Sequence, residues 1–362
     1  MTIKKITFII CLILVGAGTF WYSTLKSDNN KDLIWVHYGN LEVLPSIYDE
    51  VSDNSLRCWA FQLVWNDMIK DIDVLSQSQY FNNLNKQSST GAEIPSKNYY
   101  NKYWLFTLDL KLEIEKWVKD KFNEDVELPN FATDWWIVPQ SEDYYEWKRE
   151  MKYWIYSKFK KIIDLKNMFE TWGQWKFSSF FEDIKYFGVN CNTNKQYEQV
   201  KILYYNSDND FAISITTWKW DDIILSRWAL WTSFFTKYNS ILNRTRNYYG
   251  NQNLTRYDCL KIPEINIKTE KEFHKFNNQK ISDTEWLIHR IKTVIQNVEI
   301  KIDKPAKDKI NTDSTSGDSQ LYTWTIYHHF YLDQPFTLFI KESDKDLPYF
   351  AAQISDVTLF QE

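Results

Sequence analysis

Glycine and proline are scarce in this chain of 362 residues, since each occurs only 8 times. Neither a GxGxxG run nor a GxxxxGK run followed by Ser or Thr is present. Loops that cradle a phosphate group depend on glycines at such spacings, because only glycine lets the backbone approach the ligand closely. The sequence therefore argues against a nucleotide-binding protein of either class.

A long block of one charge sign is also missing. The 43 basic and 48 acidic residues are spread along the chain and leave a formal net charge of -5. Proteins that bind nucleic acids need a concentrated basic face to neutralise phosphates. Nucleic acid is therefore not expected as a partner.

Cysteine and histidine are few as well, with 4 and 5 residues. Cys11 lies in an apolar N-terminal run, and the other three cysteines allow one disulfide at most, which leaves open whether Cys191 and Cys259 pair. No two histidines have the i, i+4 spacing of a helical zinc site, and the neighbours His328 and His329 point to opposite faces of a strand. No pair of carboxylates stands out as an acid and a base. We predict no catalytic residues, no metal site and no cofactor.

Cys58 stands in a suggestive context, because Cys-Trp-Ala-Phe looks like the nucleophile segment of a papain-like cysteine protease. Such a site needs Gly-Ser or Gly-Ala before the cysteine, an upstream Gln, and a His about 130 to 150 residues downstream. Here Leu56 and Arg57 precede the cysteine, the upstream dozen residues hold no Gln, and the first downstream histidine is His274. We therefore expect a buried thiol on a core helix, and a protein that is not an enzyme.

The N-terminus carries the clearest targeting signal. Two lysines precede the uncharged run ITFIICLILVGAGTF. Residues 1–27 are either a signal peptide, since a Gly-Ala-Gly step suits cleavage, or a signal anchor, since the apolar run continues to Leu25. In both cases the chain is expected outside the cytoplasm, secreted or anchored by an N-terminal transmembrane segment.

After a linker at 28–32, residues 33–362 show no composition break and are predicted to form one domain. The spacing of apolar residues predicts helices over 55–72, with Cys58 in the first turn, and over 108–122, 144–169 and 234–242. Short β-rich runs predict strands at 200–205, 211–216, 222–226, 260–268 and 293–302, and two more after Pro335. Helices early and strands late indicate an α+β fold with mostly antiparallel sheets.

Aromatic residues are abundant, at 18% of the chain with 18 Trp. Clusters such as Asp134-Trp135-Trp136 and Trp218 to Trp220 are of a kind that stacks on sugars, although a core role is the simpler interpretation. The alternative function is therefore a surface-anchored binding protein that uses aromatic-rich patches for a carbohydrate or protein partner.

Five stretches, in chain order, resemble segments of the serpin family of serine protease inhibitors, in a divergent, bacterial-type form. IEKWVKDKFNED resembles the family's helix with an Asn-Lys-Trp-Val core, and VKILYYNSDNDFAISI resembles its central hairpin. LKIPEINIKTEKEF is similar to a strand with a central Pro, and VIQNVEIKID to the strand that leads into the reactive-centre loop. LDQPFTLFIKESDKDLPYFAAQISDV is similar to the final hairpin. The stretches are 114–125, 200–215, 260–273, 294–303 and 332–357.

The resemblance implies a serpin-like α+β fold with early helices, mostly antiparallel sheets and an exposed loop like the reactive centre. In inhibitory members a protease cuts this loop, which then inserts as a new strand and drags the trapped protease with it, driven by strain stored in the native state. The implied partner is an extracellular protease, and the implied state is a monomer.

The loop departs from the family pattern at its hinge, where the family carries Glu-Glu-Gly-Thr-Glu-Ala-Ala. Insertion buries alternate residues, and an unpaired buried charge costs several kcal/mol, in order of magnitude. Insertion that buries the odd-numbered residues would bury two lysines and an aspartate. Insertion that buries the even-numbered residues would bury Asp308 with Ile310, Thr312 and Ser314. A protease inhibitor and a non-inhibitory, substrate-like homologue both remain open. The predicted hinge residues are Lys304, Pro305, Ala306, Lys307, Asp308 and Lys309.

A candidate scissile window lies further along the loop. Counting forward from the hinge and back from Pro335 brackets the same short run, QLYTW. Its large apolar side chains suit a chymotrypsin-like protease, although the same residues are also of the kind that begins a strand. The window comprises Gln320, Leu321, Tyr322, Thr323 and Trp324.

Overall fold

The computed structural model describes residues 41–75, 78–87, 94–105, 108–126, 128, 152–166, 169–178, 181–190, 198–228, 232–255, 257–283, 288–303 and 328–361. All of them lie within one structural unit, Tyr38–Glu362. Segment 1–27 and the linker at 28–32 lie outside the described residues. None of the helices in the described ranges has the length and apolar character needed to span a membrane.

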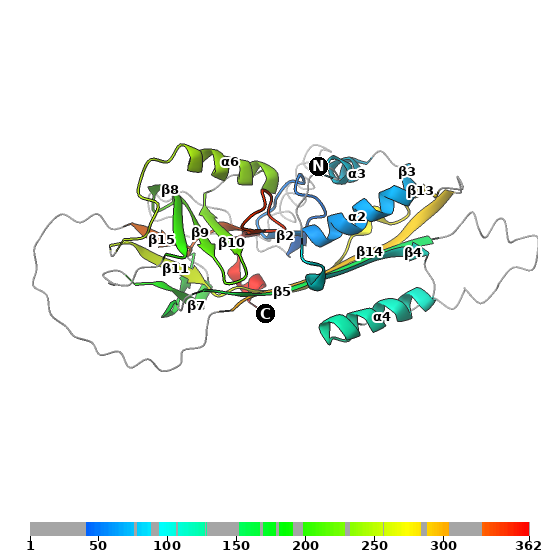
Figure 1. The fold of residues 1–362 in the computed structure, drawn as a ribbon, viewed down its shortest axis with the longest axis horizontal. Coiled ribbons are helices and arrows are strands. Elements are labelled where there is room, and N and C mark those ends of the chain that lie inside the picture. The colour runs from blue at the N-terminus through cyan, green and yellow to red at the C-terminus, as the bar shows by residue number, and fades with distance from the viewer. Residues whose placement is uncertain are drawn as a thin grey trace, which may run out of the picture. The chain divides into compact units, whose positions relative to one another are not determined.

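The longest strands, β5 and β14, are neighbours in a six-stranded sheet whose order is β3, β13, β14, β5 and β4, with β12 paired to β14 off this path. β5 and β14 run parallel, from Arg290 opposite Lys152 to Asp303 opposite Asp164. Figure 1 shows them side by side along the length of this sheet. The strands are β3 (Ile72–Val74), β4 (Tyr99–Leu105), β5 (Lys152–Asp164), β12 (Asn266–Glu272), β13 (Lys280–Asp283) and β14 (Ile288–Asp303).

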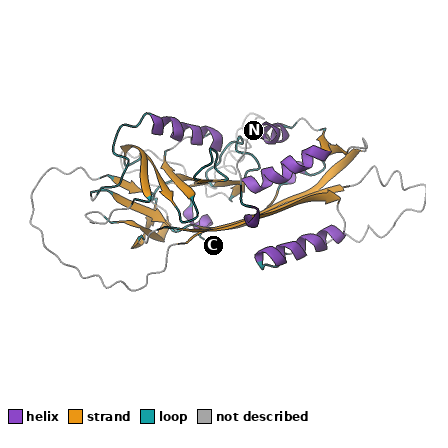
Figure 2. Ribbon diagram, viewed as in Figure 1, coloured by secondary structure: helices purple, strands orange, loops and turns teal. Residues whose placement is uncertain are grey.

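Both faces of this sheet are covered, because β5 places apolar side chains on each. Ile155 and Phe159 point into the main core with α2 (Trp59–Asp71), whereas Trp154 and Tyr156 pack with α4 (Leu108–Phe122) on the opposite face. Figure 2 shows the long strands passing between these two helices. The period of two along the strand fixes which residue belongs to which layer.

A seven-stranded sheet carries the second layer of the core, in the order β1, β2, β17, β16, β10, β9 and β8. The helix α6 (Phe234–Arg246) packs on it through Phe234 and Tyr238, which contact Phe339. The strands are β1 (Glu42–Val43), β2 (Ser55–Cys58), β8 (Val200–Ser207), β9 (Asp210–Thr216), β10 (Asp221–Arg227), β16 (Phe336–Glu342) and β17 (Phe350–Ile354).

A four-stranded sheet has the order β15, β11, β7 and β6. Among the described strands, its edge strand β15 pairs with β11 alone, in parallel. Together with one further α-helix and three 3-10 turns, these elements complete the described fold. They are β6 (Glu170–Phe177), β7 (Phe181–Val189), β11 (Cys259–Pro263), β15 (His329–Tyr331), α3 (Gln79–Gln87), η1 (Ser96–Asn98), η3 (His274–Phe276) and η4 (Val357–Phe360).

The α+β class with mostly antiparallel sheets is confirmed, since only the pairs β1–β2, β5–β14 and β11–β15 are parallel among the described strands. The helices expected at 108–122 and 234–242 and the hairpins β8–β9 and β16–β17 are also confirmed. The run expected as one strand at 260–268 divides into β11 and β12.

Two predictions about local structure are wrong. The described part of the helix expected at 144–169 is chiefly the strand β5. Because both faces of β5 are covered, its buried residues form a nearly continuous run, and such a run also satisfies helical spacing. The helix expected at 55–72 begins at Trp59, and Cys58 is the last residue of β2, with extended backbone angles, rather than part of a helical turn.

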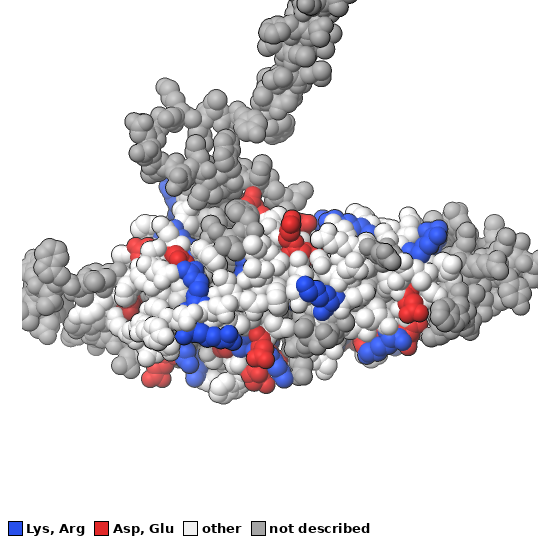
Figure 3. Space-filling model, turned by 90° about the horizontal axis from the view of Figure 1, so that it is seen from above, with Lys and Arg blue, Asp and Glu red and all other residues white. Residues whose placement is uncertain are grey.

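The described cysteines differ in state, because Cys58 is free and buried whereas Cys259 is disulfide-bonded. On the surface, Figure 3 shows acidic and basic side chains interspersed over the described residues of the face it presents. This mixture agrees with the even spread of charge along the sequence.

Candidate functional site

The boundary between β5 and β14, here called the seam, ends where the chain leaves β14 at Asp303. A segment that folds back from the end of β14 runs antiparallel to β14, and also to β5, because these two strands are parallel. Antiparallel pairing is slightly more stable per residue than parallel pairing. Entry of one strand would therefore replace one parallel pair with two antiparallel pairs.

Two polar residues lie opposite each other on the inner face of the seam, the face that packs with α2. Ser157 and Gln296 are fully buried, and the Gln296 side-chain nitrogen donates to the carbonyl oxygen of Cys58 at 3.2 Å. Ser157 Oγ and Gln296 Oε1 have no hydrogen-bond partner in the described part of the chain. On this face, β14 is thus joined by one hydrogen bond to Cys58, the residue that precedes α2.

The outer face of the seam is covered by α4 at the end that is remote from the loop. Ile114 and Val118 of α4 share one buried cluster with Tyr156 of β5 and Ile295 of β14. Tyr156 and Ile295 are paired across the seam. The helix therefore packs on both strands, and a strand that entered between them would have to displace it.

Glu124, just beyond α4, joins the helix to the middle of the seam. Its carboxylate forms ion pairs with Lys158, at 2.7 Å, and with Lys160. Lys160 Nζ also lies 3.1 Å from Glu299 Oε1, and Glu299 is its partner across the seam. Burial raises the pKa of the Glu124 carboxyl, but hydrogen bonds and charge from the two lysines outweigh burial and lower this pKa to about 2. Glu124 is therefore ionised at all ordinary pH values.

A buried ion pair fixes the loop-proximal end of β5. Lys161 Nζ lies 2.6 Å from Asp221 Oδ1, and the two side chains are only 6% and 1% exposed. The Tyr349 hydroxyl donates to the same carboxylate oxygen at 3.0 Å. β5 is thereby attached to β10 of the other sheet, close to the point where the chain leaves β14.

The predicted hinge (304–309) and the predicted scissile window (320–324) lie outside the described residues, as does the cluster Asp134–Trp136. The described chain resumes at His328, whose Nδ1 is 2.7 Å from Asp258 Oδ1. His329 Nδ1 is 3.3 Å from Asp208 Oδ2. The two neighbouring histidines therefore contact different partners, as expected for successive residues of an extended segment.

Cys58 has none of the properties of a catalytic thiolate. It is fully buried, and burial raises the pKa of its thiol to about 12 despite a backbone hydrogen bond from Ala60 and the charge of Arg57. The thiol is therefore protonated at neutral pH, and a protonated thiol is a poor nucleophile. Within the described ranges, no three His, Cys, Asp or Glu side chains are grouped so that they could hold a metal ion.

The aromatic turn between β9 and β10 is exposed, in contrast to most of the described aromatic residues. Trp218 and Trp220 are 62% and 73% exposed, and Lys219 between them pairs with Asp164 of β5 at 2.6 Å. The turn thus lies at the loop-proximal end of the seam.

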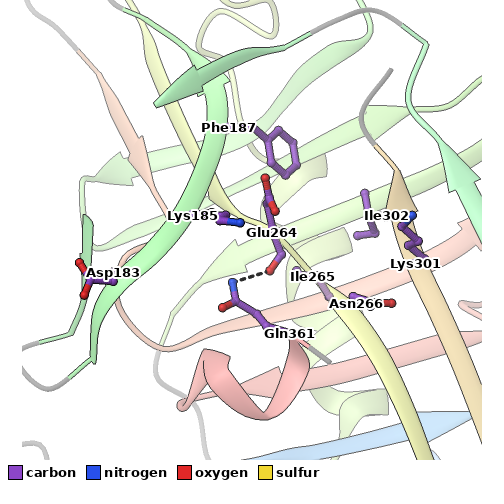
Figure 4. A pocket seen from close by; sticks show the side chains of 9 residues that line it. All are labelled: Asp183, Lys185, Phe187, Glu264, Ile265, Asn266, Lys301, Ile302 and Gln361. Carbon is purple, nitrogen blue, oxygen red and sulfur yellow. Dashed lines mark hydrogen bonds between the residues drawn. The ribbon is translucent and has the colours of Figure 1, made fainter. Parts of the chain in front are cut away.

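A cavity of about 420 Å³ borders the end of β14. Figure 4 shows side chains from three directions around it: Lys185 and Phe187 from β7, Glu264 from the segment before β12, and Lys301 from β14. The root of the loop therefore lies beside a cleft that carries both charge signs. The other lining residues are Asp183, Ile265, Asn266, Ile302 and Gln361.

Comparison with known proteins gives one consistent result. No protein-family model matches the chain, and no curated protein matches its sequence. Solved structures do match: a serine protease inhibitor (serpin)-12 of Manduca sexta has a TM-score of 0.53 at 10% identity and covers 86% of this chain and 94% of its own. Tengpin, a thermophilic serpin in its native state, has a TM-score of 0.52 at 13% identity and covers 86% and 92%. A tumour-suppressing serpin has a TM-score of 0.50 at 11% identity and covers 86% and 93%.

Proposed function

Because the chain has a serpin-like fold, we propose that it engages a protease through the segment between β14 and β15, as an inhibitor or as a non-inhibitory homologue. The observation that carries this proposal is the seam. Two long parallel strands lie side by side, and the chain leaves one of them directly into the proposed loop. This arrangement gives the loop a place to enter.

Within that function, we propose the non-inhibitory, substrate-like form. Three features oppose entry of a strand: the packing of α4 across the seam, the Lys160–Glu299 ion pair, and the Lys161–Asp221 ion pair at the loop end. Each must be broken or bypassed before a new strand can pair with β5 and β14.

The hinge composition supports the same form. On the inner face near the loop, the seam presents Ile163 and Ile300, which are buried in the main core. If the loop entered with Lys307 and Lys309 on the outer face, the Asp308 side chain would point toward these apolar side chains. A buried, unpaired carboxylate costs several kcal/mol, in order of magnitude, or takes up a proton.

We also propose an extracytoplasmic location and a chymotrypsin-like partner. The disulfide at Cys259 supports the location, because disulfides persist in oxidising compartments. The side chains of Leu321, Tyr322 and Trp324 support the choice of protease.

The test is limited digestion of the full chain with chymotrypsin-like, elastase-like and trypsin-like proteases. A denaturing gel shows any covalent complex, mass spectrometry locates the cuts, and thermal unfolding compares cut with uncut protein. We expect the chymotrypsin-like enzyme to cut within 320–324, with no complex and an unchanged melting temperature.

The chain contains its own reference site, since Tyr249 is 95% exposed and suits the same protease. Cleavage in the window should precede cleavage after Tyr249. A covalent complex, or a large rise in melting temperature after the cut, would instead establish loop insertion and an inhibitor. Equal cleavage at Tyr249 and in the window would remove the proposed role of the loop.

A further inference from the structure

Arg57, in β2, is a wholly buried charged residue whose donors are unpaired. It is 0% exposed, and its Nε, Nη1 and Nη2 atoms have no hydrogen-bond partner in the described part of the chain. A guanidinium group carries five N–H donors and no acceptor. Buried donors of this kind are very unfavourable unless an acceptor satisfies them.

The group keeps its charge at neutral pH. Burial lowers the pKa of Arg57 only to about 9, because electrostatic interactions with the neighbouring acidic groups, Asp49 among them, act in the opposite direction. Asp49 makes no hydrogen bond to the guanidinium, and its own oxygens accept from the Ser46 backbone nitrogen at 2.9 Å and from the Asn83 side chain at 2.8 Å. The positive charge is therefore not neutralised by a contact with this carboxylate.

The immediate surroundings add more donors. The Arg57 Cζ atom lies 4.3 Å from the centre of the Trp59 ring, and the indole Nε1 of Trp59 is also buried and unpaired among the described residues. Trp59 is the first residue of α2, a helix with no side-chain cap and no acidic residue in its first turn. The positive end of a helix dipole favours negative charge. The guanidinium and the indole therefore both complement an anion, and the dipole of α2 favours the same charge, although the Trp59 backbone N–H itself donates to the Tyr349 carbonyl oxygen at 2.8 Å.

We propose that Arg57 and Trp59 form an internal binding site for a small inorganic anion, such as chloride. An anion offers only acceptors, which is what four unpaired donor nitrogens require. The ligand is small because both side chains are almost wholly enclosed. This site does not depend on the proposed function.

The anion site lies next to the inner support of the seam. Arg57 immediately precedes Cys58, whose carbonyl oxygen accepts the hydrogen bond from Gln296 of β14. An anion at Arg57 therefore stabilises the end of β2, whose Cys58 carbonyl oxygen is bonded to Gln296 of the seam. Binding to the folded chain alone raises its stability with ligand concentration.

The test is thermal unfolding of the full chain at constant ionic strength, with chloride exchanged stepwise for gluconate, which is too large for an enclosed site. We expect the melting temperature to rise by about 2 °C for each tenfold increase in chloride above its dissociation constant. Arg57→Met should abolish this dependence. Lys237→Met is the matched control, because Lys237 is also a buried cation but already has an acceptor, Gln353 Oε1 at 2.5 Å, so this variant should retain the dependence.

Crystals of the native chain soaked in bromide give a second readout that needs no variant. An anomalous peak in contact with the Arg57 guanidinium supports the proposal. A native chain insensitive to chloride, a dependence that persists in Arg57→Met, or bromide peaks only elsewhere would each overturn it. Should Arg57→Met not fold, Arg57→Lys, which keeps the charge but has fewer donors, is expected to weaken the chloride dependence.

Discussion

At the end near Lys152, the seam is covered by the apolar side chains of α4, whereas toward Asp164 one ion pair, Lys160–Glu299, bridges it and a second, Lys161–Asp221, attaches β5 to β10. The remote end is held by many small contacts that do not depend on pH or on any one atom. The loop-proximal end is held by a few charged groups, each of which depends on its partner. Resistance to strand entry is therefore dispersed at one end and concentrated at the other.

This difference matters for the proposed function, because a strand that entered the seam from Asp303 would meet the ionic end first. Opening that end means separating Lys160 from Glu299 and disturbing the attachment of Lys161 to Asp221. The apolar end is reached only afterwards. The charged groups should therefore control whether β5 and β14 begin to separate. The packing of α4 should control how far the separation proceeds.

Asp221→Asn should have the largest effect, because it leaves the Lys161 ammonium buried without its anion. We expect a loss of about 3 to 5 kcal/mol in the free energy of unfolding, measured by urea denaturation. The control is Lys219→Met, which removes the exposed Lys219–Asp164 pair from the same region and should cost about 1 kcal/mol or less. Equal losses in the two variants would show that burial does not distinguish the two pairs.

Ile114→Ala tests the apolar end. This residue of α4 is fully buried between the helix and the sheet, and its truncation should cost about 2 to 4 kcal/mol because it removes packing and leaves a cavity. We expect the same loss at about pH 6 and at about pH 3, since no titrating group is removed. A loss that changes with pH would contradict the division between the two ends.

Glu124→Gln tests the ionic closure through its pH dependence. The folded-state pKa of Glu124 is about 2, below the ordinary value of 4.5, so its contribution is present above 4.5 and is lost as pH falls toward 2. Since the carboxylate is partly exposed, we expect a contribution of about 1 to 2 kcal/mol after solvent screening. Native and variant chains, compared by urea unfolding across this window, should become equally stable near its lower limit. A constant difference would show that Glu124 acts through packing instead.

Glu299→Gln should have the smallest effect on stability, about 0.5 to 1 kcal/mol, because it removes one partly exposed cross-strand pair. Its effect should be local. Hydrogen exchange of the backbone amides near Asp303 should speed up, while that of the amides near Ile295 should stay as in the native chain. Uniform acceleration along β14 would mean that the two ends open together.

The sequence predicted the parts of the fold in which neighbouring residues interact. The hairpins β8–β9 and β16–β17 follow from alternating runs joined by short polar turns, and the turn residues lie between them in the sequence. β5 was misread because a strand covered on both faces loses its alternation. Both faces of β5 are buried because α2 and α4 pack against them, and the spacing of apolar residues within β5 does not show that packing.

The candidate site was predictable only in part. The charged hinge at 304–309 departs in residue type from the family pattern, and it stays a prediction because these residues lie outside the described ones. Gln296 stands in an apolar strand run, and a polar residue in such a run indicates a buried hydrogen bond, here to the carbonyl oxygen of Cys58. The Lys161–Asp221 pair joins residues 60 positions apart, and Arg57 became unusual only when its burial was known. Neither could be recognised before the tertiary structure.

β5 pairs with β4, which precedes it in the chain, and with β14, which follows it by more than a hundred residues. During synthesis at about 5 to 20 residues per second, one edge of β5 waits on the order of ten seconds for its partner. Throughout this interval a strand with apolar side chains on both faces exposes unpaired backbone groups, which another nascent copy can bind. The feature that gives the folded chain its seam therefore makes the ribosome-bound chain dependent on rapid synthesis, low crowding or a chaperone at that edge.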